Sequence, residues 1–483
     1  MTFTEPAFWL LAILAYILWL NFRRHYRARL TGLLLCSLVF YGAHRWQLLP
    51  LLLTYCLVDW YAARWIERSR RPRLVLWLGI AFNLGVLGYF KYTALFQNTA
   101  ACLGLAAHRA AMDWEIPFGI SFYAFTGIAY LVDVYRQVVP AERQLLRYSL
   151  SAVFFPHLVA GPILRPQEFL TQLAPEALPE PRSLSMEAAL LIARGLFKKL
   201  VLADRIALAI DPFLAHVTDA STQGVWSLPY IYLYAFQIYF DFSGYTDIAR
   251  GLGLAFGFRW PENFDRPYLA TSIQEFWARW HMTLSRFLKD YLYIPLGGNR
   301  KGVVRTNINL MATMLLGGLW HGAAWSFMIW GGLHGVFLIV HRLWSRSSLC
   351  ARLPATGWRG QAVRMASIAL TFNAVCLAWC FFRLTDWSAS LACIQHVWAF
   401  SLERALAGGA RDVSLWLLLA SYALATWIAA RLPRWLWTLD WTPRQAALPV
   451  SRGFVWGFSV GLMILALLLS PGGERPAFIY FQF

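Results

Sequence analysis

The sequence has 483 residues, of which 59% are hydrophobic and 14% are charged. A soluble globular domain has about a quarter charged residues, so the composition excludes a soluble protein and predicts an all-α, polytopic integral membrane protein. The net charge of +18 comes largely from arginine clusters beside hydrophobic segments. It indicates membrane orientation with some attraction to anionic lipid, and no nucleic-acid partner.

Hydrophobic segments of roughly 17 to 25 residues, long enough to cross a bilayer, follow one another along the chain. About ten to twelve are expected to be true crossings, and the short or charged ones to form re-entrant or interfacial helices. The first segment has no basic stretch before it and no cleavage pattern after it, so we expect an uncleaved anchor. The candidate segments are residues 7–22, 31–44, 46–63, 74–96, 114–134, 147–163, 187–210, 227–256, 306–320, 323–341, 366–384, 413–430 and 453–470.

Arginine clusters orient these segments. They follow the first, third and tenth candidates, at residues 23–29, 64–73 and 342–364, and the positive-inside rule places all three in the cytoplasm. Counting crossings from them places residues 431–452 in the cytoplasm as well. The N-terminus and the C-terminal tail, residues 478–483, are then expected on the opposite side of the membrane.

Two polar segments interrupt the hydrophobic pattern. Residues 166–185 are rich in Pro, Glu and Ser and are predicted to form a loop. Residues 258–307 mix charges with aromatic side chains, which is typical of an interfacial or re-entrant segment facing water. Within the second, a helix is predicted over residues 272–293, with Ser272 as N-cap and Glu275 at the capping-box position. His281 lies in this helix, where a histidine is by itself more often structural than catalytic.

The most informative residue is His321. It lies in a stretch from residue 307 to residue 340 that contains no Asp, Glu, Lys or Arg. An ionisable side chain at such depth is costly, and histidine exchanges protons near neutral pH, so His321 is a candidate functional residue. The neighbouring glycines allow a helix or a ligand to approach closely. The alternative is that they serve helix packing and that His321 makes one interhelical hydrogen bond.

Three further polar residues in apolar segments need a role. Asp241 and Asp247 lie six residues apart in one apolar segment, on different faces of a helix, so we expect each to pair with an arginine or a backbone amine and not to form a carboxylate pair. His157 lies between two prolines, which predicts a broken helix that can line a cavity. The seven cysteines show no metal-binding spacing, so no metal site is predicted. Cys376 and Cys380 share a helix face and are expected to be small buried side chains.

At this point the chain resembles a known family. Residues 275–285, 290–300 and 316–322, with their two histidines forty positions apart (321 minus 281), resemble the signature of the membrane-bound O-acyltransferases. Residues 155–165 and 239–247, and the ending at residues 476–483, are similar to the bacterial branch typified by alginate O-acetylation proteins. The likeness covers nearly the whole chain and is weakest over residues 344–453. It implies one membrane-embedded domain, 1–483, with a motif core at about 114–342 and peripheral helices at 1–113 and 343–483.

The resemblance implies helices around a central tunnel and transfer of an acyl group from a cytoplasmic thioester to a hydroxyl. It makes His321, near the middle of the tunnel, the essential catalytic residue and His281, toward the cytoplasmic mouth, the second active-site histidine. A neutral imidazole can take the proton of the attacking hydroxyl, while His281 or Asn299 stabilises the oxyanion or places the donor. Residues expected to help bind donor or substrate are Trp320, Asp241, His157 and the basic Arg279, Arg286 and Lys289, with Arg300 and Lys301, although membrane topology explains the basic residues almost as well.

The resulting hypothesis is an acetyltransferase of a bacterial inner membrane with both termini periplasmic. It has no bound cofactor, uses acetyl-CoA or another thioester as donor, and works with periplasmic or membrane-anchored polysaccharide O-acetyltransferases on an alginate- or cellulose-type exopolysaccharide. Direct transfer is preferred to a covalent intermediate because no Ser or Cys has triad-like neighbours. Three alternatives stay open: D-alanyl or other acyl transfer to an envelope polymer, a transporter of an acyl carrier, and a scaffold for periplasmic enzymes. His321-dependent release of the thiol would separate the enzymes from the other two.

Overall fold

A computed structural model describes residues 1–105, 116–159, 161–180, 184–219, 222 and 227–398, together with positions 417, 419, 420, 461 and 478. Every regular element in these residues is a helix, which confirms the all-α prediction. The described chain divides into two compact units. The first comprises Met1–Ala188, Ile248–Glu262 and Arg286–Leu292, and the second comprises Ala189–Asp247, Asn263–Ser285 and the described part of Tyr293–Phe483.

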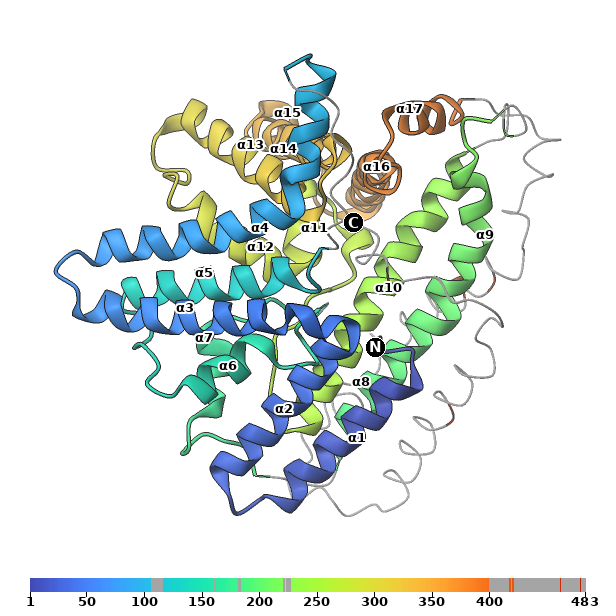
Figure 1. Ribbon diagram of the computed structural model, residues 1–483. Helices are drawn as coiled ribbons and strands as arrows, with labels where there is room; N and C mark the ends of the chain where they lie inside the picture. The colour runs from blue at the N-terminus through green and yellow to red at the C-terminus, as the bar shows by residue number, and fades with distance from the viewer. Residues whose placement is uncertain are drawn as a thin grey trace. The chain divides into compact units, whose positions relative to one another are not determined.

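The first unit begins with helices whose starts the sequence explains. Prolines stand at the first or second position of α1, α3 and α4, where a missing amide hydrogen costs nothing. Helices α3, α4 and α5 pack side by side, as Figure 1 shows. The elements up to residue 173 are α1 (Pro6–Asn21), α2 (Tyr26–Arg45), η1 (Trp46–Leu48), α3 (Leu49–Arg68), α4 (Pro72–Cys102), α5 (Ile120–Tyr135), α6 (Leu145–Val153), α7 (Pro166–Phe169) and η2 (Leu170–Leu173).

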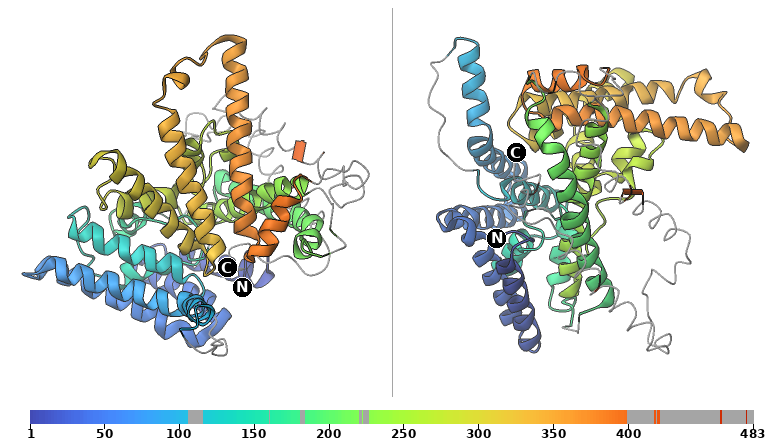
Figure 2. Two further views of the ribbon diagram at one scale, coloured as in Figure 1. Left: turned by 90° about the horizontal axis from the view of Figure 1, so that it is seen from above. Right: turned by 90° about the vertical axis from the view of Figure 1, so that its right-hand side faces the viewer.

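The following part of the chain contains the two motif histidines. Helices α13 and α14 form its most extensive helix pair, and Figure 2 shows α14 and α16 side by side, joined at one end by the segment that carries α15. The elements are α8 (Met186–Leu196), η3 (Phe197–Ala203), α9 (Asp204–Ala215), α10 (Leu228–Ala255), η5 (Pro267–Leu269), α11 (Ile273–Arg279), α12 (Met282–Leu288), η6 (Lys289–Tyr293), α13 (Gly302–His321), α14 (Trp325–Trp344), α15 (Ser348–Ala351), α16 (Gly357–Arg383) and α17 (Trp387–Gln395).

Three of these helices, α4, α14 and α16, are long and apolar enough to span a membrane. Helices α1 and α5 are apolar but shorter. Large hydrophobic side chains such as Trp77, Leu78 and Leu370 are exposed on these long helices, as expected for a surface solvated by lipid. The expectation of ten to twelve crossings stays a prediction, and the candidates at 413–430 and 453–470 lie outside the described residues except for positions 417, 419, 420 and 461.

Two local predictions were wrong. The first, a loop over residues 166–185, fails only at its beginning, where α7 and η2 form. Pro166 starts this helical turn, in which the Arg165 amide donates to Glu168 Oε2 at 2.9 Å and the Glu168 amide donates to the Arg165 carbonyl at 2.9 Å. The single helix expected over residues 272–293 is broken between α11 and α12 at His281, whose φ is 41°. Ser272 does cap α11 by accepting a hydrogen bond from the Glu275 amide.

Glycines set the close crossing of α13 and α14. A Cβ on Gly318 would meet the carbonyl oxygen of Phe327, and a Cβ on Gly331 would meet that of Met314. Both obstacles are backbone atoms, which cannot rotate away. The packing interpretation of these glycines is therefore confirmed.

Substituting Gly331→Ala is expected to lower the free energy of unfolding by about 1–3 kcal/mol, because overpacking forces the two helices apart. The adjacent Gly332→Ala is the matched control, since its Cβ would lie at an ordinary 3.5 Å from Leu315 Cδ2. Thermal unfolding of both purified variants measures the difference. Equal stability of the two variants would contradict the assignment of Gly331 to the crossing.

Candidate active site

His281 lies at the break between α11 and α12, where hydrogen bonds from outside the helix replace those that the helix has lost. The Asn263 carbonyl accepts from the Met282 amide at 3.0 Å. Asn263 Oδ1 lies 3.1 Å from His281 Nδ1 and accepts from the Thr283 amide at 3.2 Å and the Thr283 hydroxyl at 3.0 Å. His281 is fully buried, so the break fixes its ring inside the protein.

His321 is the last residue of α13, and Gly322 ends the helix in extended backbone. A Cβ on Gly322 would run into the ring of Phe327, so this turn requires glycine. Three aromatic rings surround the His321 ring, with centroids at 4.9 Å for Trp320, 5.0 Å for Trp330 and 5.2 Å for Phe382. The imidazole is 5% exposed and therefore lies in an aromatic, low-dielectric environment.

Trp320 connects the two motif histidines. Its ring centroid lies 6.1 Å from that of His281 and 4.9 Å from that of His321. All three residues are buried and belong to the second unit. The structure thus brings together three residues that the sequence nominated from two motifs.

Burial controls the charge of His281. Desolvation lowers the pKa of its imidazole from 6.5 to about 3, so the ring is neutral at physiological pH. Phe242 meets its ring edge-on with centroids 4.7 Å apart. Its Nε2 is buried and has no hydrogen-bond partner within the described part of the chain.

This shift predicts an acid-sensitive fold. The pKa of the histidine in the folded state lies below that in the unfolded state, so its contribution to stability is complete above about pH 6.5 and is lost as the pH falls toward 3. Between pH 6.5 and 4.5, protonation of this one group is expected to lower the free energy of unfolding by about 2 kcal/mol. The free energy of unfolding is measured at both pH values for wild type and for His281→Asn. The decrease from pH 6.5 to 4.5 should be about 2 kcal/mol smaller for His281→Asn. Parallel pH profiles would contradict the prediction.

A third buried histidine was not among the predicted site residues. His334 in α14 is fully buried, and its Nδ1 accepts a hydrogen bond from Trp277 Nε1 at 3.3 Å. Its ring centroid lies 4.9 Å from that of Trp330, the same ring that contacts His321. The signal was present, since His334 lies in the same uncharged stretch as His321.

The two carboxylates of α10 have separate partners, as expected from their spacing. Asp247 binds Arg194 through two hydrogen bonds of 2.7 and 2.8 Å and Lys198 through one of 2.7 Å. Asp241 pairs at 2.8 Å with Lys199, a lysine in place of the expected arginine or backbone amine, and Lys199 also pairs with Asp204 at 2.8 Å. The π-helical turn η3 carries both lysines, within a segment that the sequence analysis took as an apolar span.

The residues predicted to bind the donor are divided between the two units. In the second unit, Arg279 pairs with Glu275 at 2.6 Å, and Asn299 is exposed on the segment before α13. In the first unit, Arg286 pairs with Glu168 at 3.0 Å, and Lys289 is exposed. Two of the five cations expected to attract donor phosphates, Arg279 and Arg286, are therefore already paired with carboxylates. Donor binding by these residues stays a prediction.

His157 belongs to the first unit and so to a different compact unit from the motif histidines. Helix α6 ends at Val153, which confirms the predicted broken helix, and His157 is buried with its ring centroid 5.3 Å from Trp260 and 5.5 Å from Phe169. Its Nε2 has no hydrogen-bond partner among the described residues. Its aromatic surroundings favour a packed core position.

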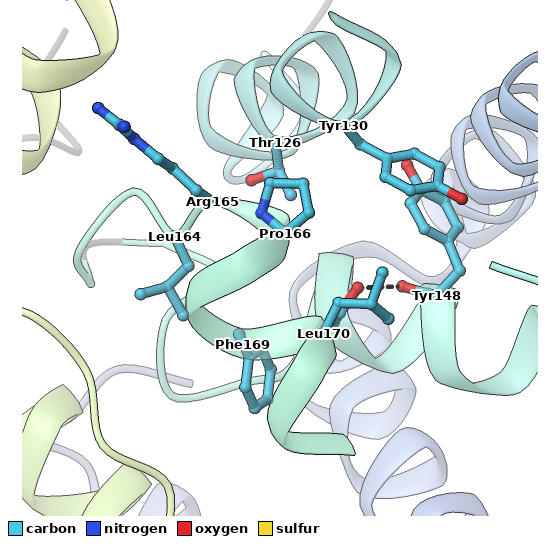
Figure 3. A pocket seen from close by; sticks show the side chains of 9 residues that line it. Thr126, Tyr130, Tyr148, Leu164, Arg165, Pro166, Phe169 and Leu170 are labelled. Carbon is cyan, nitrogen blue, oxygen red and sulfur yellow. Dashed lines mark hydrogen bonds between the residues drawn. The ribbon is translucent and has the colours of Figure 1, made fainter. Parts of the chain in front are cut away.

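A small cavity also lies in the first unit. Figure 3 shows Tyr130 and Tyr148 on one side and Phe169 and Leu170 on another, with the Arg165 side chain pointing away from the two tyrosines. The cavity measures about 10 Å³, room for about one water molecule, so it is too small for a substrate. Within the described residues, no three His, Cys, Asp or Glu side chains are placed to hold a metal ion.

Comparison with known proteins decides the family. The model of the membrane-bound O-acyltransferase family matches residues 117–385, more than half of the chain, including both motif histidines. The chain belongs to this family. It is therefore a membrane protein and an acyltransferase.

The names of individual relatives of this acyltransferase refer to different polymers. A probable alginate O-acetylase AlgI of Pseudomonas putida is 34% identical over the full length of both chains. A peptidoglycan O-acetyltransferase of Helicobacter pylori is 37% identical over 75% of this chain and 72% of its own. A teichoic acid D-alanyltransferase of Bacillus subtilis is 28% identical over 55% of this chain and 68% of its own.

The C-terminal ending that resembles the alginate branch has one described residue. Phe478 is buried and stacks on Tyr245 with centroids 3.8 Å apart, and its centroid lies 6.2 Å from that of Phe242. Phe242 in turn contacts His281. Phe478 therefore lies beside the Phe242 ring, which packs against one of the motif histidines.

Proposed function

We propose that this acyltransferase takes acetyl groups from a cytoplasmic thioester and supplies them for O-acetylation of an exopolysaccharide of the alginate or cellulose type. The observation that carries the chemistry is the buried group of His281, Trp320 and His321. The alignment with the alginate O-acetylase of Pseudomonas putida spans both chains completely, which supports an exopolysaccharide acceptor.

The chemistry needs a base and a protected site. In the proposed reaction, His321 accepts the proton of the acceptor hydroxyl as its oxygen attacks the thioester carbonyl. The new C–O bond forms, the C–S bond breaks, and the departing thiolate takes this proton from His321, which returns to its neutral form. The aromatic rings around His321 exclude water, which suppresses hydrolysis of the thioester. Transfer is direct, without an acyl-enzyme, and no cofactor is bound.

The cellular setting is also proposed. The protein resides in a bacterial inner membrane with about ten to twelve crossings around a central tunnel and both termini in the periplasm. Acetyl-CoA or another thioester is the donor on the cytoplasmic side. Periplasmic or membrane-anchored polysaccharide O-acetyltransferases receive the group and complete its transfer to the polymer.

The test uses inside-out vesicles that contain the protein, given acetyl-CoA labelled in the acetyl group, with His321→Ala at matched abundance as the reference. We expect wild type to release free coenzyme A and to move label into the partner acetyltransferase or polysaccharide, and the variant to do neither. A parallel reaction with a D-alanyl carrier protein tests the other acyl group. Label that crosses the membrane still attached to its thiol would show a transporter and overturn the proposal.

A further inference from the structure

Asn263 is the only described side chain that hydrogen-bonds the ring of His281, and it is 1% exposed. Its main-chain carbonyl binds the Met282 amide, and its side-chain oxygen binds the amide and hydroxyl of Thr283. One residue therefore holds three consecutive positions of the break between α11 and α12.

These hydrogen bonds settle which way the asparagine amide faces. A backbone N–H can only donate, so the atom that faces the Thr283 amide must be the oxygen of Asn263 and not its nitrogen. The same oxygen lies 3.1 Å from His281 Nδ1. Because an amide oxygen can only accept, Nδ1 must carry the hydrogen.

The tautomer follows from this chain of contacts. In a neutral imidazole only one nitrogen carries a hydrogen, so Nε2 has a free lone pair. This nitrogen is buried and has no partner within the described part of the chain, as is also true of Asn263 Nδ2. The arrangement leaves an acceptor on His281 unused, and His281 is held at a φ of 41°, which non-glycine residues rarely adopt.

We infer that Asn263 is a positioning residue that fixes His281 as the Nδ1–H tautomer, so that His281 presents Nε2 to the substrate as a hydrogen-bond acceptor. Resting on the proposed function, this assigns His281 the placement of a substrate group that carries an N–H or O–H, such as an amide of the thioester's pantetheine arm. Neutral His281 in this tautomer cannot donate from Nε2 to a developing oxyanion.

The groups that face His281 do not titrate near neutral pH. They are Phe242 from α10, Trp320 from α13, and Asn263 and Thr283. Asp241, beside Phe242 on α10, is paired with Lys199. Within the described part of the chain, a carboxylate introduced at position 263 would therefore be the first charge in contact with this imidazole.

The first test replaces Asn263 by aspartate, which keeps the shape and the acceptor but adds a negative charge. The charge stabilises the imidazolium, so the acidic limb of the pH–rate profile of acyl transfer should move up by roughly one to three pH units. Asn263→Ala frees the ring and should lower kcat/KM by about 10- to 100-fold. Asn309→Asp, another buried asparagine that binds the Gly298 carbonyl, controls for general damage and should leave the acidic limb in place.

The second test does not depend on activity. Histidine labelled with ¹⁵N in the full-length protein in lipid gives different nitrogen shifts for the two neutral tautomers, and comparison with His281→Asn assigns the signal. We expect His281 as the Nδ1–H form in wild type and a mixture of forms in Asn263→Ala. An Nε2–H signal in wild type, or an unmoved acidic limb in Asn263→Asp, would overturn the inference. If the expected Nδ1–H signal is found but the protein shows no acyl transfer, the result would instead contradict the proposed function.

Discussion

Replacing His321 by alanine is expected to lower the rate of acyl transfer by about 100- to 10,000-fold, the usual contribution of a general base. The described rings that contact His321 are those of Trp320, Trp330 and Phe382, and none of these three can accept the proton in its place. The rate is measured as thiol release from the thioester donor by purified protein in lipid vesicles. Fold and abundance are matched by thermal unfolding and by size-exclusion chromatography.

A second histidine variant serves as the control. His341 lies in the last turn of α14 and is partly exposed, so His341→Ala should keep its rate within about twofold of wild type. A His321→Ala protein that folds normally and retains more than a tenth of the wild-type rate would remove His321 from the chemistry. The packing glycines on α13 would then be the reason for this motif.

Replacing Asp247 by asparagine is expected to lower the free energy of unfolding by about 3–5 kcal/mol, because it leaves a buried cation without its counter-charge. The side chains of Asp247 and Lys198 are each 7% exposed, and the two form an ion pair of 2.7 Å. Lys198 cannot reach water from the π-helical turn η3 without disturbing its packing against α10. Loss of the Asp247 carboxylate therefore leaves the positive charge of Lys198 buried without this counter-charge.

The measurement is thermal or denaturant unfolding of the purified protein in one lipid or detergent. Asp219→Asn is the matched control, since Asp219 pairs with His216 at a position where both side chains are at least half exposed. An exposed pair contributes about 1 kcal/mol at most. Equal stability of the two variants would show that the buried pair between η3 and α10 adds nothing to the fold.

The helical class and the site histidines could be predicted from the sequence, whereas several local features could not. Low charge content is a property of composition, so a membrane protein made of helices follows before any contact is known. His321 was identifiable because it is an ionisable residue in a stretch without other charges. The break at His281 was not identifiable, because it depends on hydrogen bonds to Asn263, eighteen positions earlier in the chain (281 minus 263).

Long-range pairing explains the other differences as well. Lys198 and Lys199 lie in a segment that reads as apolar, and their carboxylate partners on α9 and α10 account for their burial. Arg279 and Arg286 look like free cations in the sequence, yet each already has a carboxylate partner in the structure. Residue type alone does not tell whether a charge is available to a ligand.

By itself the sequence determined that this protein is helical, lies in a membrane and carries two histidines in motifs shared with the membrane-bound O-acyltransferases. These properties depend on composition and short motifs, which are local. Only the tertiary structure decided that the Trp320 ring contacts both His281 and His321, and that the Trp330 ring contacts both His321 and His334. It also decided that Asn263 sets the orientation of His281. The reason is physical: a ring contact, an ion pair or a tautomer depends on which distant residues the folded chain brings within a few ångströms.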